Sequence, residues 1–168
     1  GRADESLDLL PIGHPGPARR IAVGVPPHDF VVKSDGRWAA VINATNPIVR
    51  FAHLDSARVE RRIELPPGEA VQMLGWNSDG DLVQTSSEMQ IFIGRFDRPQ
   101  IPVKRLVKED HQIFGIAFSP DSSWVLSTGY NGRSRIWDWS SETAVSEYAG
   151  AGTAIQWSPD GRWIAWKD

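Results

Sequence analysis

Short apolar runs alternate with clusters of turn-forming residues along the whole chain. The runs are rich in Val, Ile, Phe and Trp, and Gly, Pro, Asn, Asp or Ser bounds them, as in AAVINAT (39–45), WVLSTG (124–129) and SRIWDW (134–139). Runs of this length between such residues predict β-strands. No segment repeats its apolar residues at helical spacing for long enough to predict a helix. The pattern therefore predicts an all-β chain of many short strands.

The strand-turn-strand pattern repeats. Four turn aspartates stand in similar contexts, KSDGRW, NSDGDL, SPDSSW and SPDGRW, and are separated by 44, 42 and 39 residues; they are Asp35, Asp79, Asp121 and Asp160. A tryptophan follows three of these aspartates at the third position, at Trp38, Trp124 and Trp163. Four short strands in each period of about 40–45 residues predict the blades of a β-propeller.

The phase of the repeat gives the blade boundaries. Residues 5–27 have the pattern of the last two strands of a blade, 28–66, 69–109 and 112–149 that of three full blades, and 153–168 that of the first two strands of another. The chain, 1–168, is thus one domain with four blades' worth of strands that starts and ends in mid-blade. Three arrangements fit: a fragment of a larger propeller, a ring completed by a second chain such as a homodimer, and a closed four-bladed disc.

The stretch HQIFGIAFSPDSSWVLSTGYNGRSRIWD (111–138) resembles a WD40 repeat. It has the histidine, the FSPD turn, the small residues of the second strand and the closing RIWD. The resemblance implies a WD40-like propeller and a buried hydrogen-bonded tetrad within this blade, formed by His111, Ser127, Asn131 and Trp137. Asn131 stands where the family has aspartate, which weakens the charge-assisted part of the network. Ala52 and Gly94 correspond to the tryptophan in the preceding repeats, so we expect those blades to lack the tetrad.

Two other repeated features have structural interpretations. The tryptophans at the repeated position could form a ligand surface, but large aromatic residues of this kind normally lie in the core between blades. Basic pairs recur in the fourth-strand segments, at Arg19-Arg20, Arg61-Arg62 and Lys104-Arg105. They could form a docking strip for an acidic partner, but interspersed glutamates favour a role in discouraging sheet-to-sheet association at the blade edges.

Composition narrows the class of protein. The net charge is -3, from 18 basic and 21 acidic residues, so no overall charge favours nucleic acid or an anionic membrane. The chain has no cysteine, and no apolar run has the ~20 residues that a membrane-spanning helix needs. The polar first residues do not resemble a signal peptide. We therefore expect a cytoplasmic or nuclear protein, with nucleic acid an unlikely partner.

The sequence contains no motif that predicts catalysis. None of the four histidines has a partner at metal-ligand spacing. A nucleophile elbow, a Gly-rich phosphate loop and a zinc motif are missing from the sequence. We therefore expect no catalytic residues, no metal site, no cofactor and no enzymatic activity.

The resemblance instead implies protein recognition. In WD40 propellers the loops between second and third strands share one face with the loops that link successive blades. These loops contain our candidate partner-binding residues: Tyr130, Arg133, Asn46, Glu88, Asp110 and His28. We expect a non-catalytic interaction scaffold. The alternative is a propeller within a larger enzyme or signalling protein that gates or positions substrate for another domain, because WSPDGRWIAW also resembles repeats of propellers attached to periplasmic proteins and peptidases.

Overall fold

Strands are the only regular structure in the described part of the chain. The computed structural model describes residues 5–12, 16–67, 70–86, 89–108, 111–150, 152 and 154–167. Sixteen strands form five antiparallel sheets among these residues. None of the described segments is a helix that could cross a membrane.

The sheets follow one another along the chain. A two-stranded sheet comes first, with β1 (Ser6–Leu9) and β2 (Arg19–Ala22). Three four-stranded sheets follow. The first consists of β3 (Asp29–Val32), β4 (Trp38–Asn43), β5 (Asn46–His53) and β6 (Arg58–Glu64). The second consists of β7 (Val71–Trp76), β8 (Asp81–Ser86), β9 (Gln90–Arg95) and β10 (Lys104–Lys108), and the third of β11 (Ile113–Phe118), β12 (Trp124–Gly129), β13 (Arg133–Asp138) and β14 (Thr143–Ala149). A two-stranded sheet comes last, with β15 (Ala154–Trp157) and β16 (Ile164–Lys167).

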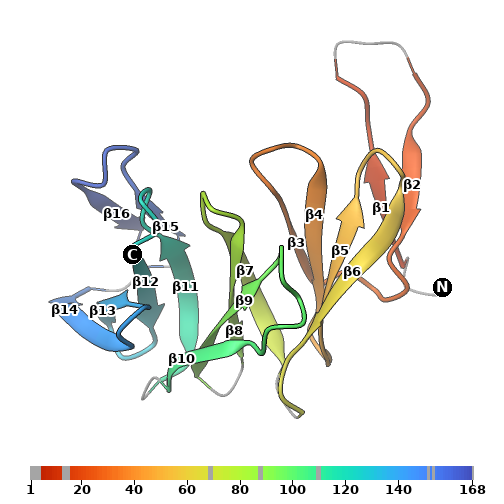
Figure 1. The fold of residues 1–168 in the computed structure, drawn as a ribbon. Coiled ribbons are helices and arrows are strands. Elements are labelled where there is room, and N and C mark those ends of the chain that lie inside the picture. The colour runs from red at the N-terminus through yellow and green to blue at the C-terminus, as the bar shows by residue number, and fades with distance from the viewer. Residues whose placement is uncertain are drawn as a thin grey trace.

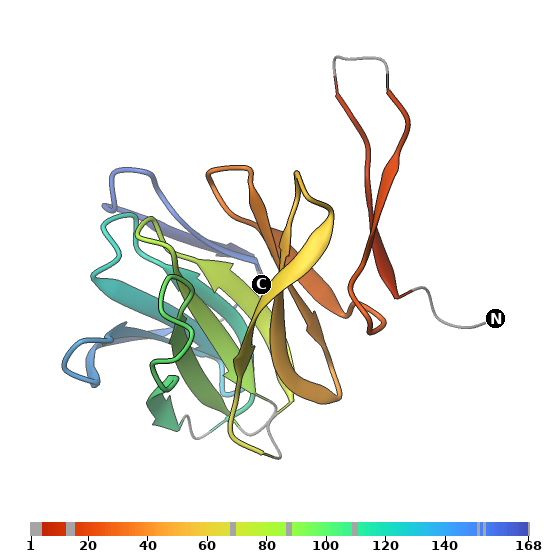
Figure 2. The same cartoon turned by 45° about the vertical axis from the view of Figure 1, so that its right-hand side comes forward.

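Each sheet pairs its strands in chain order, and the sheets stand side by side in an arc (Figures 1 and 2). The first strands contact one another in succession, β3 with β7, β7 with β11 and β11 with β15. They therefore lie on the inner side of the arc, and β6, β10 and β14 are the outer edges of their sheets. This radial arrangement of four-stranded meanders is that of a β-propeller, as the repeat predicts.

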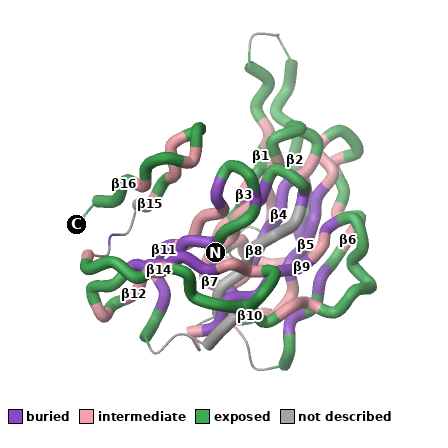
Figure 3. The backbone as a smooth tube through the Cα atoms, turned by 60° about the vertical axis from the view of Figure 1, so that its left-hand side comes forward, coloured by how far each residue is buried: buried purple, intermediate pink, exposed green. Residues whose placement is uncertain are grey.

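The hydrophobic core lies in the seams between neighbouring sheets. Phe51 on β5 and Phe92 on β9 are buried in the seam between the first two four-stranded sheets. Ile93 and Trp137 belong to the next seam, and Ile21 of β2 packs on the other face of the first four-stranded sheet. Figure 3 shows buried positions concentrated in the middle sheets, whereas β14 and β16 are largely exposed.

The repeated aspartates organise the turns between first and second strands. Asp121 Oδ1 accepts hydrogen bonds from Ser119 Oγ at 2.6 Å and from the Ser123 N–H at 3.1 Å. Asp160 Oδ1 has the same contacts with Ser158 and Arg162. Aspartate is favoured in such turns because its short side chain bonds the main chain two residues on. This local chemistry explains why aspartate marks the period.

Only one of the repeated tryptophans is enclosed as predicted. Trp38 is partly buried and packs edge-on against Phe96 of the next sheet, with ring centroids 5.0 Å apart. Trp124 and Trp163 are 40% and 69% exposed, so assigning them to the core was wrong. Phe96 follows the third strand of its sheet, and β15–β16 has no third strand among the described residues to cover Trp124 in the same way. No further described sheet packs over Trp163.

The first members of the basic pairs point across the seams rather than outward. Arg19 on β2 donates to the carbonyls of Leu54 and Asp55 in the next sheet, at 2.8 and 3.1 Å. Arg61 on β6 donates to the Phe96 carbonyl at 3.0 Å. Lys104 on β10 donates to the carbonyls of Trp139 and Ser140, at 3.0 and 3.1 Å (residues 139–140 follow β13). These three basic residues therefore have a structural role that the predicted protection of sheet edges does not include, because each links the last strand of its sheet to the next sheet.

Candidate protein-interaction surface

Strand alternation places the predicted loops on one side of the sheets. Because consecutive strands are antiparallel, the turns between second and third strands lie at the same end of the sheets as the links between sheets. We call this end the linker face. The turns between first and second strands lie at the opposite end. Of the predicted partner-binding residues, Glu88 and Asp110 lie outside the described residues.

Tyr130 and Arg133 lie together at the turn between β12 and β13. The Tyr130 side chain is 73% exposed, and its ring rests edge-on against Phe114, with centroids 4.9 Å apart. The Tyr130 N–H donates to the Gln112 carbonyl at 3.1 Å. The turn itself uses Gly132 at φ 70°, a conformation that glycine adopts without strain. A large aromatic side chain is thus held outward on a hydrogen-bonded turn.

Arg133 is oriented by an acidic neighbour. Its guanidinium forms an ion pair with Glu147 on β14. Arg135 also donates to Glu147, at 2.8 Å. Hydrogen bonds from Arg135 and Arg133, together with their charges, hold the pKa of the Glu147 carboxyl below its usual value. More than half of the Arg133 side chain stays exposed, so the guanidinium keeps donors that face solvent.

His28 and Asn46 form a separate group on the first four-stranded sheet. The His28 N–H donates to the Ile42 carbonyl at 2.8 Å, and the His28 side chain is exposed. Asn46 begins β5 opposite Asn43, and its Oδ1 is buried without a hydrogen-bond partner. The whole sheet β7–β10 separates these residues from Tyr130. The structure therefore brings the predicted residues together in two groups on the linker face.

The blade with the WD40-like motif contains a buried side-chain hydrogen bond. Trp137 Nε1 donates to Ser127 Oγ at 2.8 Å, in the interior of the sheet. Asn131 Oδ1 accepts from the Arg133 N–H at 3.0 Å, so it supports the turn. His111 is exposed and lies near Asn131, because both flank Gly129. Two of the four predicted tetrad residues, Ser127 and Trp137, are thus linked by the buried bond, and the other two, His111 and Asn131, lie beside Gly129 at the end of β12.

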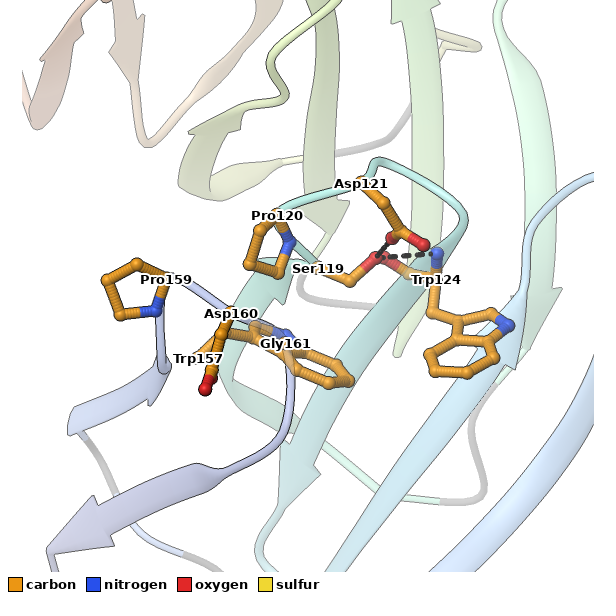
Figure 4. Close-up of a pocket in the computed structure, with 8 residues that line it drawn as sticks. All are labelled: Ser119, Pro120, Asp121, Trp124, Trp157, Pro159, Asp160 and Gly161. Carbon is orange, nitrogen blue, oxygen red and sulfur yellow. Dashed lines mark hydrogen bonds between the residues drawn. The ribbon is translucent and has the colours of Figure 1, made fainter.

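A pocket that the sequence did not predict lies at the opposite end of the sheets (Figure 4). Two neighbouring Ser-Pro-Asp turns form its rim, it has a volume of about 380 Å³, and Trp124 and Trp157 line it. Hydrogen bonds from Ser119 and the Ser123 N–H lower the pKa of Asp121, and Ser158 and the Arg162 N–H do the same for Asp160. Both carboxylates therefore support their own turns. The signal in the sequence was the repeated SPD motif, but only the fold shows that two copies are adjacent.

Comparison with known proteins places these features in a family context. The family model for the WD domain, G-beta repeat, matches residues 102–138, which include the turn with Tyr130 and the Trp137–Ser127 bond. The chain is also 26% identical over 136 residues to an uncharacterized WD repeat-containing protein of Synechocystis sp.. That match covers 77% of this chain and 38% of the relative, so the chain spans well under half the relative's length.

Proposed function

We propose that this chain, a WD40-repeat protein with the all-β propeller-type fold that its sequence predicts, recognises a protein partner through its linker face. WD repeats generally mediate protein–protein interaction. The observation that carries the proposal for this chain is Tyr130, a 73% exposed aromatic side chain on a hydrogen-bonded turn. Exposed large aromatic residues of this kind are among the commonest interaction hot spots.

The turn lowers the entropy cost of binding. Phe114 supports the Tyr130 ring, so less side-chain freedom is lost when a partner contacts it. Arg133 stands three residues away with its guanidinium oriented by Glu147. Tyrosine beside arginine offers an apolar surface and a fork of donors, which suits a partner segment with an apolar residue next to a carboxylate or a carbonyl. We propose binding without turnover as the role of this surface.

A second candidate function follows from the length of the relative. Because the chain spans 38% of that protein, its propeller-type sheets could serve a larger chain that contains other domains. In that case the linker face would position a substrate or partner for a reaction that another domain of the same polypeptide catalyses. The two candidates differ in a measurable way, since the second requires a catalytic domain in the same polypeptide and the first does not.

Site-specific photo-crosslinking tests the proposal. A photoreactive phenylalanine derivative replaces Tyr130 in one variant and Trp163 in another. Trp163 is the matched control, because it is an aromatic residue of similar exposure, 69%, at the opposite end of the sheets. The proposal predicts a discrete protein adduct from position 130 in extracts of the source organism, and none from position 163. Adducts from position 163 alone, or equal adducts from both, would count against the linker face.

A further inference from the structure

Arg50 is a buried cation without an acidic partner. It lies in the middle of β5 and is 6% exposed. Its Nη1 donates to the Ile48 carbonyl at 3.4 Å, which is long for a hydrogen bond. No described carboxylate forms an ion pair with it. A guanidinium has five N–H donors, so the protein satisfies little of the donor capacity of Arg50.

A second arginine stands directly opposite. The register of β5 and β6 pairs Arg50 with Arg62, and Arg62 has no described carboxylate partner either. Residues directly opposite in an antiparallel pair have Cβ atoms about 4.5–5.5 Å apart, so like charges there repel. Burial lowers the pKa of Arg50, and the charge of Arg62 lowers it further. Two guanidinium groups thus share one face of the sheet, and no described carboxylate forms an ion pair with either of them.

The two arginines lie at the seam with the first sheet. Val41, opposite Arg50 on β4, packs in a cluster with Ile21 and Val23, which places this face of the sheet against β2. β2 also contacts β6, the strand that bears Arg62. Since β2 and β6 are both last strands of their sheets, this seam reaches the outer rim. The Arg50 side chain is buried at this seam, whereas Arg62 is exposed.

Other arginines among the described residues do pair with carboxylates. Arg133 and Arg135 share Glu147, and Arg20 donates to Asp8 at 2.8 and 3.0 Å. Glu60 and Glu64 each lie two residues from Arg62 on β6. Glu60 accepts a hydrogen bond from Ser56 and Glu64 stands opposite Ile48, and neither forms an ion pair with Arg50 or Arg62. Burying a charge that is left unpaired costs free energy. Arg50 and Arg62 therefore have the composition of an anion site rather than of an internal salt bridge.

We propose that Arg50 and Arg62 bind an oxyanion, a phosphate or a carboxylate group, at the rim between β2 and β6. The forked donors of two guanidinium groups match the oxygens of such a group and allow two-point binding. The bound anion replaces the repulsion between the arginines with two attractions. The ligand is a free anion or an anionic side chain of a partner, and the chemistry of recognition is the same for both.

Thermal unfolding in phosphate and in chloride at equal ionic strength tests this site. Arg62→Gln removes one of the two guanidinium groups of the proposed site. The matched control Arg58→Gln removes one positive charge from the same strand, at the position opposite His53. At ten times the phosphate dissociation constant, we expect the unfolding midpoint of the wild type and of R58Q to rise by about 3–6 °C more than in chloride. R62Q should lack this saturable rise. In chloride alone, R62Q should be at least as stable as the wild type, because the repulsion is gone.

Two results would overturn the site. Phosphate stabilises many proteins by exclusion from their surfaces, and such an effect would raise the midpoints of R62Q and the wild type equally. Equal responses to phosphate and chloride would also exclude it. Titration with acetate then separates the ligand sources: a saturable response to phosphate alone assigns the site to a phosphate group, and an equal response to acetate assigns it to a carboxylate.

Discussion

Lys104 Nζ donates to the main-chain carbonyl of Trp139 at 3.0 Å, across the seam between the second and third four-stranded sheets. The ammonium group also donates to the Ser140 carbonyl, pairs with Glu142 at 3.1 Å and lies 5.9 Å from the centroid of the Trp139 ring. Arg19 and Arg61 make the corresponding link at the two preceding seams. A cation on the outer strand of one sheet thus binds the loop after the third strand of the next.

Removing this link should loosen the seam. Lys104→Met keeps most of the side-chain volume but loses both hydrogen bonds to carbonyls and the ion pair. We expect the free energy of unfolding to fall by about 1–2 kcal/mol, the range for hydrogen bonds to a partly exposed charged group. Urea denaturation measures it. Arg105→Met on the same strand is the control and should cost less, because Arg105 donates only a long hydrogen bond of 3.4 Å to Gln90, within its own sheet. Equal losses in both variants would show that Lys104 does not tie the sheets together.

The bond between Trp137 and Ser127 should couple the two side chains energetically. Ser127→Ala leaves the indole N–H buried without its acceptor, which should cost about 1–3 kcal/mol. Trp137→Phe removes the donor, so Ser127→Ala should then cost less. A double-mutant cycle of S127A and W137F in urea measures the coupling. Additive losses would contradict a role for the bond in holding β12 to β13.

Gly115 on β11 should tolerate no side chain. A Cβ there would collide with the Thr128 hydroxyl, which donates to the Gly152 carbonyl at 3.0 Å. Gly115→Ala should therefore break the bond that joins this sheet to the link before β15, and the melting temperature should fall. Gly75→Ala is the matched control, since a Cβ at Gly75 on β7 meets no atom within 4 Å. If both variants melt at the same temperature, the close approach at Gly115 is not needed.

Acid should weaken the turn after β13. Hydrogen bonds from the Ser140 hydroxyl and from the Ser141 and Ser140 N–H groups lower the pKa of Asp138 to about 2. A carboxyl whose pKa is lower in the folded state stabilises the fold above its unfolded pKa of ~3.9 and loses this effect as pH falls towards 2. We expect Asp138→Asn to show a smaller loss of stability between about pH 4 and pH 2 than the wild type. Urea midpoints across this range measure it, and identical pH profiles would refute the assignment.

The turn chemistry and the period were readable from the sequence because they are local. Asp121 binds groups two residues away, so the SPD motif predicts its turn without knowledge of the fold. The WD40-like stretch likewise led to the buried Trp137–Ser127 bond. These features depend on residues within one sheet, and a single repeat contains all of them.

Contacts between sheets were harder to predict. Arg19, Arg61 and Lys104 recur at intervals of 42 and 43 residues, but the sequence does not say whether a cation on an edge strand faces solvent or the next sheet. Ser146 occupies the corresponding place in the third four-stranded sheet, opposite Ile136, so the series ends there. The exposure of Trp163 and the burial of Arg50 depend in the same way on which strands cover them.

The central claim is that Tyr130 on the linker face contributes most of the binding free energy for a protein partner. It is tested by the affinity of a partner, identified by photo-crosslinking, for three forms of this chain. The wild type, Tyr130→Ala and Trp163→Ala are compared by isothermal titration. We predict that Y130A binds at least about 30-fold more weakly, as expected for a hot spot of about 2 kcal/mol or more, and that W163A binds like the wild type. Unchanged affinity of Y130A with weakened W163A would place recognition at the opposite end of the sheets and contradict the proposal.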